Sequence, residues 1–171
     1  MSGDMTHVVK LFGDSIVAEQ TEKGTYMVRK GENMLSPFEY SEIRQLTPKC
    51  WRLFRPEDRR CDLIFASGVM QFGFHFAYAL EKMGRGRKKK SWVAVMLKNG
   101  TGVYDDSGNL VAFLPGLVNV AIAEDKFIVA LLWAFSEPYV KVYTMWGEFL
   151  AEGFMSEALK KAKAKVEQAW A

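Results

Sequence analysis

The sequence predicts an α+β protein, built as an antiparallel β meander of seven or more strands with two helices. Three observations predict this fold. Short runs of β-branched and aromatic residues alternate with turn signals along most of the chain. The last fifteen residues show an apolar stripe at helical spacing. The 171 residues are 49% hydrophobic, which is enough for a real core in a domain of ordinary size.

The N-terminal part predicts a small meander followed by a short helix. The runs 8–12, 15–19 and 25–29 are strand-like, and glycine-containing turns separate them. The sequence Ser36-Pro37-Phe38-Glu39 is typical of a helix start, with a capping residue before a proline in the first turn. We therefore expect a short helix near 37–46, followed by an irregular segment rich in Pro and Arg.

The most aromatic segment predicts a strand with one aromatic face. Phe72, Phe74, Phe76 and Tyr78 alternate with small residues or histidine, although a helical pattern also fits such a short run. This stripe is either core or a surface on which bases stack. Trp92 to Leu97 predicts the next strand. Residues 84–90 would then form the exposed tip of a long hairpin, since two glycines and five cations cannot be core.

From residue 92 onward the chain is divided regularly by turn signals. The first is the tight-hairpin dipeptide Asn99-Gly100. Residues 103–112 also match residues 142–151 at four identities, with an offset of 39 residues. This gives 92–152 a weak likeness to propeller blades, but a ring needs at least about four blades. We expect a twisted meander rather than a propeller.

The C-terminus predicts an amphipathic helix over 156–170. Ser156 can cap it, and Leu159, Ala162, Val166 and Trp170 form its apolar stripe. Lysines occupy the remaining surface, and Lys163 can pair with Glu167 one turn later. Such a stripe normally packs on the protein's own sheet, while a terminal tryptophan can also anchor a neighbouring molecule.

Residues 1–171 are interpreted as one domain, with the meander, helix and Pro/Arg-rich segment in 1–62 and the sheet and C-terminal helix in 63–171. The N-terminus lacks the pattern of a secretory signal, and the longest apolar run, 127–135, is about half of a membrane span. We expect a soluble, cytoplasmic protein with no membrane partner. Cys50 and Cys61 fit free thiols rather than a disulfide framework.

No motif for a metal, a cofactor or a catalytic group is found in the sequence. The two histidines lack partners at metal-ligand spacing, and phosphate-loop and nucleophile-elbow patterns are missing. A lesser alternative is an enzyme with a dispersed active site made of His75, Cys61, Asp62 and Arg60.

Charge placement is the most informative functional feature. The net charge is only +3, but five cations lie in residues 84–90, so that the rest of the chain is net −2. Further basic residues lie in a loop and on the last helix. The candidate binding residues are Arg85, Arg87, Lys88, Lys89, Lys90, Arg59, Arg60, Lys160 and Lys161.

A glycine-spaced basic segment suits phosphate contact, because cations that neutralise phosphates release counterions. The leading hypothesis is a small, non-enzymatic binding protein that engages nucleic acid or a nucleoprotein machine, such as an accessory or inhibitory factor of viral type. The alternative is a protein-interaction or assembly subunit, including a homo-oligomer, whose basic tip docks on an acidic protein surface.

Overall fold

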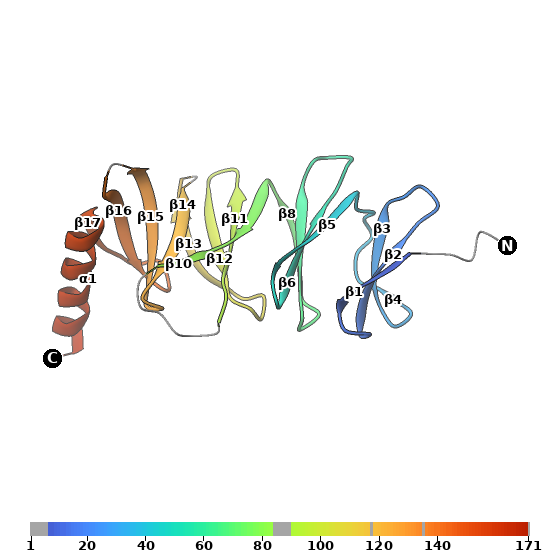
Figure 1. Cartoon of the computed structure of the whole chain (residues 1–171), viewed down its shortest axis with the longest axis horizontal. Helices are drawn as coiled ribbons and strands as arrows, with labels where there is room; N and C mark the ends of the chain where they lie inside the picture. Colours follow the sequence, from blue (N-terminus) through green and yellow to red (C-terminus); the bar gives the residue numbers. More distant parts are fainter. Residues whose placement is uncertain (1–6, 84–89, 117, 135, 171) are drawn as a thin grey trace.

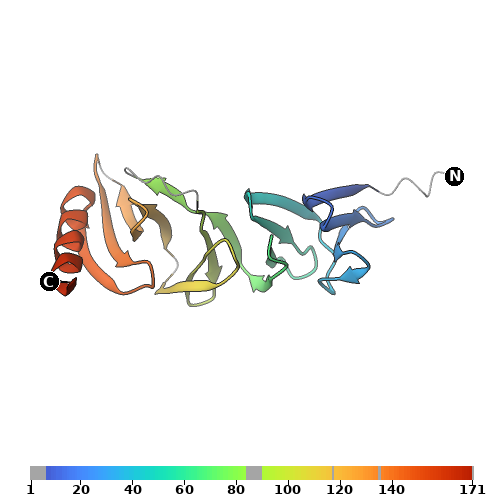
Figure 2. The ribbon, with the colours of Figure 1, turned by 90° about the horizontal axis from the view of Figure 1, so that it is seen from below.

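The computed structural model describes residues 7–83, 90–116, 118–134 and 136–170. The described residues form four β-sheets that follow one another in a row, with a helix after the last (Figure 1). The two chain ends lie at opposite ends of this row, and a view turned by 90° shows the same order (Figure 2). The described chain therefore forms an open row and does not close into a ring.

The first two sheets come from the N-terminal half. Sheet 1 has the order β1 (Val8–Phe12), β2 (Ile16–Gln20), β3 (Tyr26–Lys30) and β4 (Asn33–Met34). Sheet 2 has the order β5 (Glu42–Thr47), β6 (Cys50–Phe54), β7 (Cys61–Phe65) and β8 (Met70–Phe74). All neighbours in both sheets are antiparallel.

The last two sheets are linked by one strand that crosses between them. Sheet 3 has the order β13 (Leu110–Pro115), β12 (Gly100–Tyr104), β11 (Val93–Leu97) and β9 (Phe76–Ala79). Sheet 4 has the order β10 (Glu81–Met83), β14 (Asn119–Ala123), β15 (Phe127–Ala134), β16 (Pro138–Thr144) and β17 (Phe149–Phe154). Although β10 follows β9 directly, it joins sheet 4, where it pairs in parallel with β14. Helix α1 (Met155–Trp170) ends the described chain.

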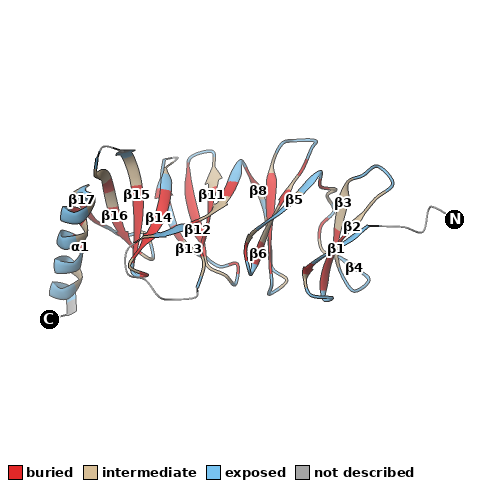
Figure 3. Cartoon of the chain, viewed as in Figure 1, coloured by how far each residue is buried: buried red, intermediate tan, exposed pale blue. Residues whose placement is uncertain are grey.

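The core lies between successive layers, because the inner strands bury side chains on both faces. Along β7, Ile64 packs in a cluster with residues of sheet 1, whereas Leu63 and Phe65 pack with residues of sheet 3. Two further clusters join sheet 3 to sheet 4 and sheet 4 to α1. Figure 3 shows the buried residues along the middle of each sheet, with exposed residues at the strand ends. Side chains alternate along a strand, so each inner sheet contributes to two cores.

A five-residue turn recurs between antiparallel strands of all four sheets. In the turn 105–109, Asp105 N–H donates to Asn109 O (3.0 Å) and Gly108 N–H donates to Asp105 O (3.2 Å). The same two bonds occur in the turns 21–25, 65–69 and 144–148. The fourth residue of each turn is a glycine with φ between 87° and 93°, a backbone region that favours glycine. The 39-residue sequence repeat thus corresponds to the last hairpins of sheets 3 and 4.

The helix expected near 37–46 is wrong, because this segment forms an irregular link followed by β5. Ser36 Oγ does accept a bond from Phe38 N–H (3.1 Å), as at a helix start. The same hydroxyl also bonds Tyr40 Oη at 2.6 Å inside the protein. The capping signal therefore marks a local serine turn, and pairing of β5 with β6 takes up the chain that follows.

The single aromatic face expected for residues 72–78 is also wrong. Gly73 adopts a φ of 85°, and the run is split between β8 of sheet 2 and β9 of sheet 3. As a result, Phe74 is buried, whereas Phe72 and Phe76 are nearly half exposed. The long hairpin expected on either side of residues 84–90 is confirmed only in the pairing of its strands. β9 does pair with β11, but β10 comes between them in the chain, and residues 84–89 lie outside the described residues.

The α+β class, the antiparallel strands and the C-terminal helix are confirmed, although the strands form four sheets instead of one. Helix α1 packs on β16 and β17 through Ala158 and Ala162, with Leu159 and Val166 at the margin. Lys163 pairs with Glu124 of the β14–β15 turn at 2.8 Å, not with Glu167. Among the described helices, none has the length and hydropathy that a membrane span requires.

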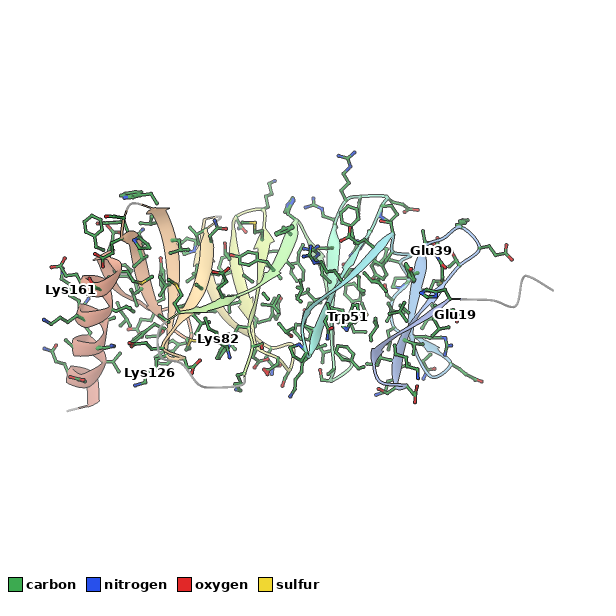
Figure 4. The ribbon with its side chains drawn as sticks, in the orientation of Figure 1. Glu19, Glu39, Trp51, Lys82, Lys126 and Lys161 are labelled. Atoms are coloured by element: carbon green, nitrogen blue, oxygen red, sulfur yellow. The ribbon has the colours of Figure 1, made fainter. Side chains whose placement is uncertain are left out.

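A buried ion pair lies on the side of sheet 2 that faces sheet 1. Asp62 of β7 is fully buried, and its carboxylate accepts bonds from the Arg55 guanidinium at 2.6–3.1 Å. Tyr40 Oη (2.6 Å) and Gly73 N–H (2.9 Å) also donate to it. The Arg55 guanidinium stacks on Phe38, 3.6 Å from the ring centroid. The Trp51 side chain of sheet 2 (Figure 4) donates from Nε1 to the backbone carbonyl of Leu11 in sheet 1, at 3.0 Å.

Replacing Asp62 by Asn should destabilise the protein by about 3 kcal/mol, the lower end of the range for a broken buried pair, because the Arg55 guanidinium keeps only the half-exposed Asp58 carboxylate as its ion-pair partner. Chemical denaturation monitored by tryptophan fluorescence measures this loss. The matched control is Glu19→Gln, which breaks the partly exposed Arg29–Glu19 pair (2.9 Å) and should cost less than about 1 kcal/mol. Equal losses in the two variants would contradict the role given to the buried pair.

Replacing Gly108 by Ala should destabilise the protein more than the equivalent change Gly24→Ala. Both glycines have nearly the same φ, 89° and 87°. A Cβ on Gly108 would lie 2.8 Å from the Phe65 ring, whereas one on Gly24 would lie 4.0 Å from the Gln20 amide. The difference should be about 1–3 kcal/mol of overpacking, measured as the difference in unfolding free energy in urea. A difference near zero would argue against tight packing of the turn 105–109 on sheet 2.

Candidate nucleic-acid interface

The candidate basic residues that the structure describes lie in three places, the β6–β7 loop, the segment before β11, and α1. Arg59 and Arg60 lie in the β6–β7 loop of sheet 2, where Arg59 is exposed and has a φ of 58°. The Arg60 guanidinium contacts the ring nitrogens of His75. The backbone N–H of His75 donates to the backbone carbonyl of Met96 (2.9 Å), near the end of β11. Lys90 precedes the start of that strand.

Arg59 and Arg60 are therefore distant from the other candidate residues. A strand advances about 3.3 Å per residue, so the two ends of β11 are roughly 15 Å apart. Packed layers are about 10 Å apart, and two layers separate sheet 2 from α1, which carries Lys160 and Lys161. The two arginines thus lie roughly 30 Å along the row from the lysines of the helix.

The last residue of β10 lies close to the helix that carries Lys160, Lys161 and Lys163. The backbone of Met83, the last residue of β10, accepts a bond from Glu124 N–H (2.8 Å). The Glu124 carboxylate binds Lys163 Nζ of α1 at 2.8 Å. The chain therefore leaves sheet 4 towards residues 84–90 at a point that two bonds connect to α1. Sequence separation alone gives no sign of this proximity.

An open groove of about 530 Å³ runs between α1 and the β14–β15 turn. Lys160 and Lys163 line it, together with Glu124 and Glu167. Because Glu124 compensates Lys163, Lys160 is the cation of this groove that has the most freedom to meet a ligand. Lys161 is exposed on α1, and it points outward at the end of the row (Figure 4).

Two lysines that the sequence interpretation missed belong to the same region. Lys82 of β10 and Lys126 of the β14–β15 turn lie along one side of the row (Figure 4). Lys82 Nζ is 5.8 Å from the Trp92 ring centroid, and Lys126 is exposed. Lys90 is exposed too, whereas Arg85, Arg87, Lys88 and Lys89 lie outside the described residues. In the sequence these four residues lie between Met83 and Lys90.

Glu137 fixes the start of the helix that carries these lysines. Its carboxylate accepts bonds from Ser156 N–H (2.8 Å) and Ser156 Oγ–H (2.5 Å). The cap therefore comes from the β15–β16 loop, and Ser156 itself lies inside the helix. These bonds lower the pKa of the Glu137 carboxyl below its ordinary value of 4.5. A carboxylate at a helix N-terminus also favours the helix dipole.

The residues of the dispersed enzyme site are only partly brought together. Cys61 and His75 line one cavity between sheets 2 and 3, with Arg60 beside His75. Burial raises the pKa of the Cys61 thiol to about 11, so it is protonated near neutral pH and a poor nucleophile. Asp62 points to the other face of sheet 2, where it binds Arg55 and Tyr40. The geometry thus gives Asp62 a structural role.

Comparison with known proteins gives no family for this chain. No protein-family model matches it, and no curated protein matches it significantly.

The Glu137 cap should make the start of α1 sensitive to acid. Because the carboxyl pKa is lower in the folded chain than in the unfolded chain, the contribution of the cap is present above about pH 4.5. It is lost as the pH falls through the lowered folded value. We expect the hydrogen-exchange protection factors of the first turn of α1 to fall between pH 6 and pH 3.

Glu137→Gln should have low protection at both pH values, since an amide cannot supply the charged cap. The control Glu157→Gln also removes one carboxylate, but from the first turn of α1 itself, and it should keep the pH dependence. If Glu137→Gln behaves like the wild type, the cap does not position the helix.

Proposed function

We propose that this chain is a nucleic-acid-binding module that contacts the phosphate backbone at the end of the row formed by sheet 4 and α1. One observation carries the proposal. The bond of Met83 O to Glu124, and of Glu124 to Lys163, connects the start of the most basic segment to the lysine-bearing helix. Met83, which directly precedes the basic segment in the sequence, thus lies close to Lys163, eighty positions later in the chain.

The charges of this region support the proposal. Three exposed cations contribute: Lys126 lies in the turn after the strand that pairs with β10, Lys160 lines the groove beside that turn, and Lys90 precedes β11. The four cations of residues 84–89 add to them in the sequence. Each lysine or arginine that neutralises a phosphate releases a counterion, so a cluster of this size gives affinity without any base contact. The proposed ligand is therefore recognised by its backbone, with weak sequence preference.

The distances between the layers also reduce the set of candidate binding residues. Arg59 and Arg60, at the far end of the strands of sheet 2, are left out of the proposed interface because roughly 30 Å separates them from α1. Lys82 and Lys126 take their place. The proposed set is Lys82, Lys90, Lys126 and Lys160, with Arg85, Arg87, Lys88 and Lys89 of the basic segment.

The salt dependence of binding tests this proposal. We expect binding of a labelled 20-mer to weaken linearly with salt on logarithmic axes, by about 0.9 per neutralised phosphate for duplex DNA. The double variant Lys126→Ser, Lys160→Ser should flatten this slope by about 1–2. Fluorescence anisotropy at several salt concentrations measures it, with duplex DNA, single-stranded DNA and RNA as separate probes.

The matched control removes two charges elsewhere. Arg59→Ser with Arg60→Ser should leave the slope unchanged, although the net charge falls by the same amount. Wild-type protein that binds none of the three probes at low salt would falsify the proposal. Equal flattening by the two double variants would show that net charge, and not the surface at α1, governs binding.

A protein-interaction role is favoured by a different observation, an exposed aromatic ladder on sheet 4. Trp133 stacks on Tyr139 with ring centroids 4.8 Å apart, and Phe154 meets Tyr139 edge-on at 5.4 Å. Trp133 is 52% exposed and Phe154 42%. Aromatic side chains of this kind are enriched at interfaces. This candidate predicts a concentration-dependent mass in light scattering, or a partner lost on Trp133→Ser, without dependence on Lys126 and Lys160.

A further inference from the structure

A cavity lies between sheets 2 and 3, at the ends of the strands that carry Arg60 and His75. Glu42, Phe54 and Cys61 stand side by side on three neighbouring strands of sheet 2, on the side that faces sheet 3. Sheet 3 covers this row only with the start of β9. A cavity of about 220 Å³ remains, lined by Glu42, Arg52, Phe54, Cys61, His75 and Phe76.

The inner part of the cavity is apolar and the outer part is polar. Phe54 and Phe76 approach it from sheets 2 and 3, and the Cys61 side chain lies at the buried end, where it is only 2% exposed. Glu42 and His75 are exposed and lie at the mouth. Pockets for drug-sized ligands measure about 300–1,000 Å³, so this cavity suits a smaller body, such as a single ring.

Arg52 presents a fixed guanidinium to the cavity. The side chain is only 13% exposed. Its Nη1 donates to Ala77 O (3.0 Å), and its Cζ lies 5.1 Å from the Phe76 ring centroid. Its contact to Glu42 Oε1 is long, at 3.5 Å. A guanidinium has five N–H donors, so Arg52 retains donors in a fixed geometry that matches a carboxylate.

The mouth of the cavity carries an excess of positive charge. Arg52 lines it and Arg60 stands beside it, against one carboxylate, Glu42. Because the Arg60 guanidinium cannot accept a hydrogen bond, the His75 ring nitrogen that it contacts acts as the acceptor. An anion that enters thus meets two guanidinium groups before it reaches the apolar interior.

We infer that this cavity binds a small organic anion in which a carboxylate is attached to a flat apolar ring. The ring would lie with Phe54 and Phe76, above the Cys61 side chain. The carboxylate would take the free donors of Arg52 and displace the long contact of Glu42. This site is separate from the basic surface at α1, so that neither depends on the other.

Benzoate is the probe, titrated into the ¹⁵N-labelled full chain at constant ionic strength and observed by NMR. We expect saturable shifts confined to the amides of the cavity, from residues 42 and 52–54 to 61 and 75–76. Benzamide has the same shape without the charge and should bind at least about tenfold more weakly, as the loss of one charged hydrogen bond implies. Acetate, which lacks the ring, should also bind more weakly.

Glu42→Gln sharpens the test without touching the core, since the Glu42 side chain is 59% exposed. Removal of the competing carboxylate should tighten benzoate binding several-fold, whereas Glu39→Gln, the same change in the link before β5, should not. Arg52→Gln should abolish the preference for benzoate over benzamide, with a spectrum that reports whether the variant is folded. The inference is overturned by unsaturable or scattered shifts, by equal affinity for benzamide, or by unchanged affinity in Glu42→Gln.

Discussion

Burial of both faces of every inner sheet is the constraint on which the rest of the structure depends. Sheets 2 and 3 each supply side chains to two cores, and sheet 4 is covered by sheet 3 on one side and α1 on the other. No inner sheet therefore buries its apolar surface without both neighbours, as in other repeat architectures. The helix completes this scheme, because Ala158 and Ala162 cover the last face, which would otherwise be exposed.

The first interlayer core differs from the others, since it contains the ion pair of Arg55 and Asp62 inside an apolar cluster. A buried ion pair contributes little net stability against an apolar replacement of the same shape. Its geometry is more demanding, because the Asp62 carboxylate also accepts bonds from Tyr40 and Gly73. These partners come from the link before β5 and from β8. The pair therefore selects one arrangement of the link between sheets 1 and 2.

The parts of the fold that local chemistry controls could be predicted from the sequence. A hairpin does form next to Asn99-Gly100, although its two turn residues are Lys98 and Asn99, since Gly100 already pairs with Leu97. Gly108 has the positive φ that its turn needs. The apolar stripe of the last helix packs as expected, because a long amphipathic pattern has one interpretation. Residues 37–46 could not be predicted in this way. Ser36 does form the local turn that its sequence predicts. No helix follows in this segment, because the Ser36 hydroxyl bonds to the Tyr40 hydroxyl and the next residues pair as a strand.

The division of the chain into four sheets depends on contacts that no local pattern records. Alternation of Phe72 to Tyr78 predicts one strand, but β8 ends at Phe74 in sheet 2 and β9 begins at Phe76 in sheet 3. A blade-like repeat was visible only where two hairpins kept both tyrosines, at Tyr104 and Tyr143. The equivalent turn 65–69 follows Ile64 instead of a tyrosine, so the sequence likeness fades although the backbone bonds are the same.

The candidate site shows the same limit, and β10 explains it. Counting charges identifies Lys160 and the basic segment, because composition needs no fold. Counting cannot show that Arg60 stands apart from them or that Lys126 joins them. That separation arises because three residues, Glu81 to Met83, leave sheet 3 and pair with β14 in sheet 4. A strand this short carries too little sequence information to predict its partner, yet it determines which cations share a surface. The proposed interface thus depends less on how many basic residues the chain has than on which sheet β10 joins.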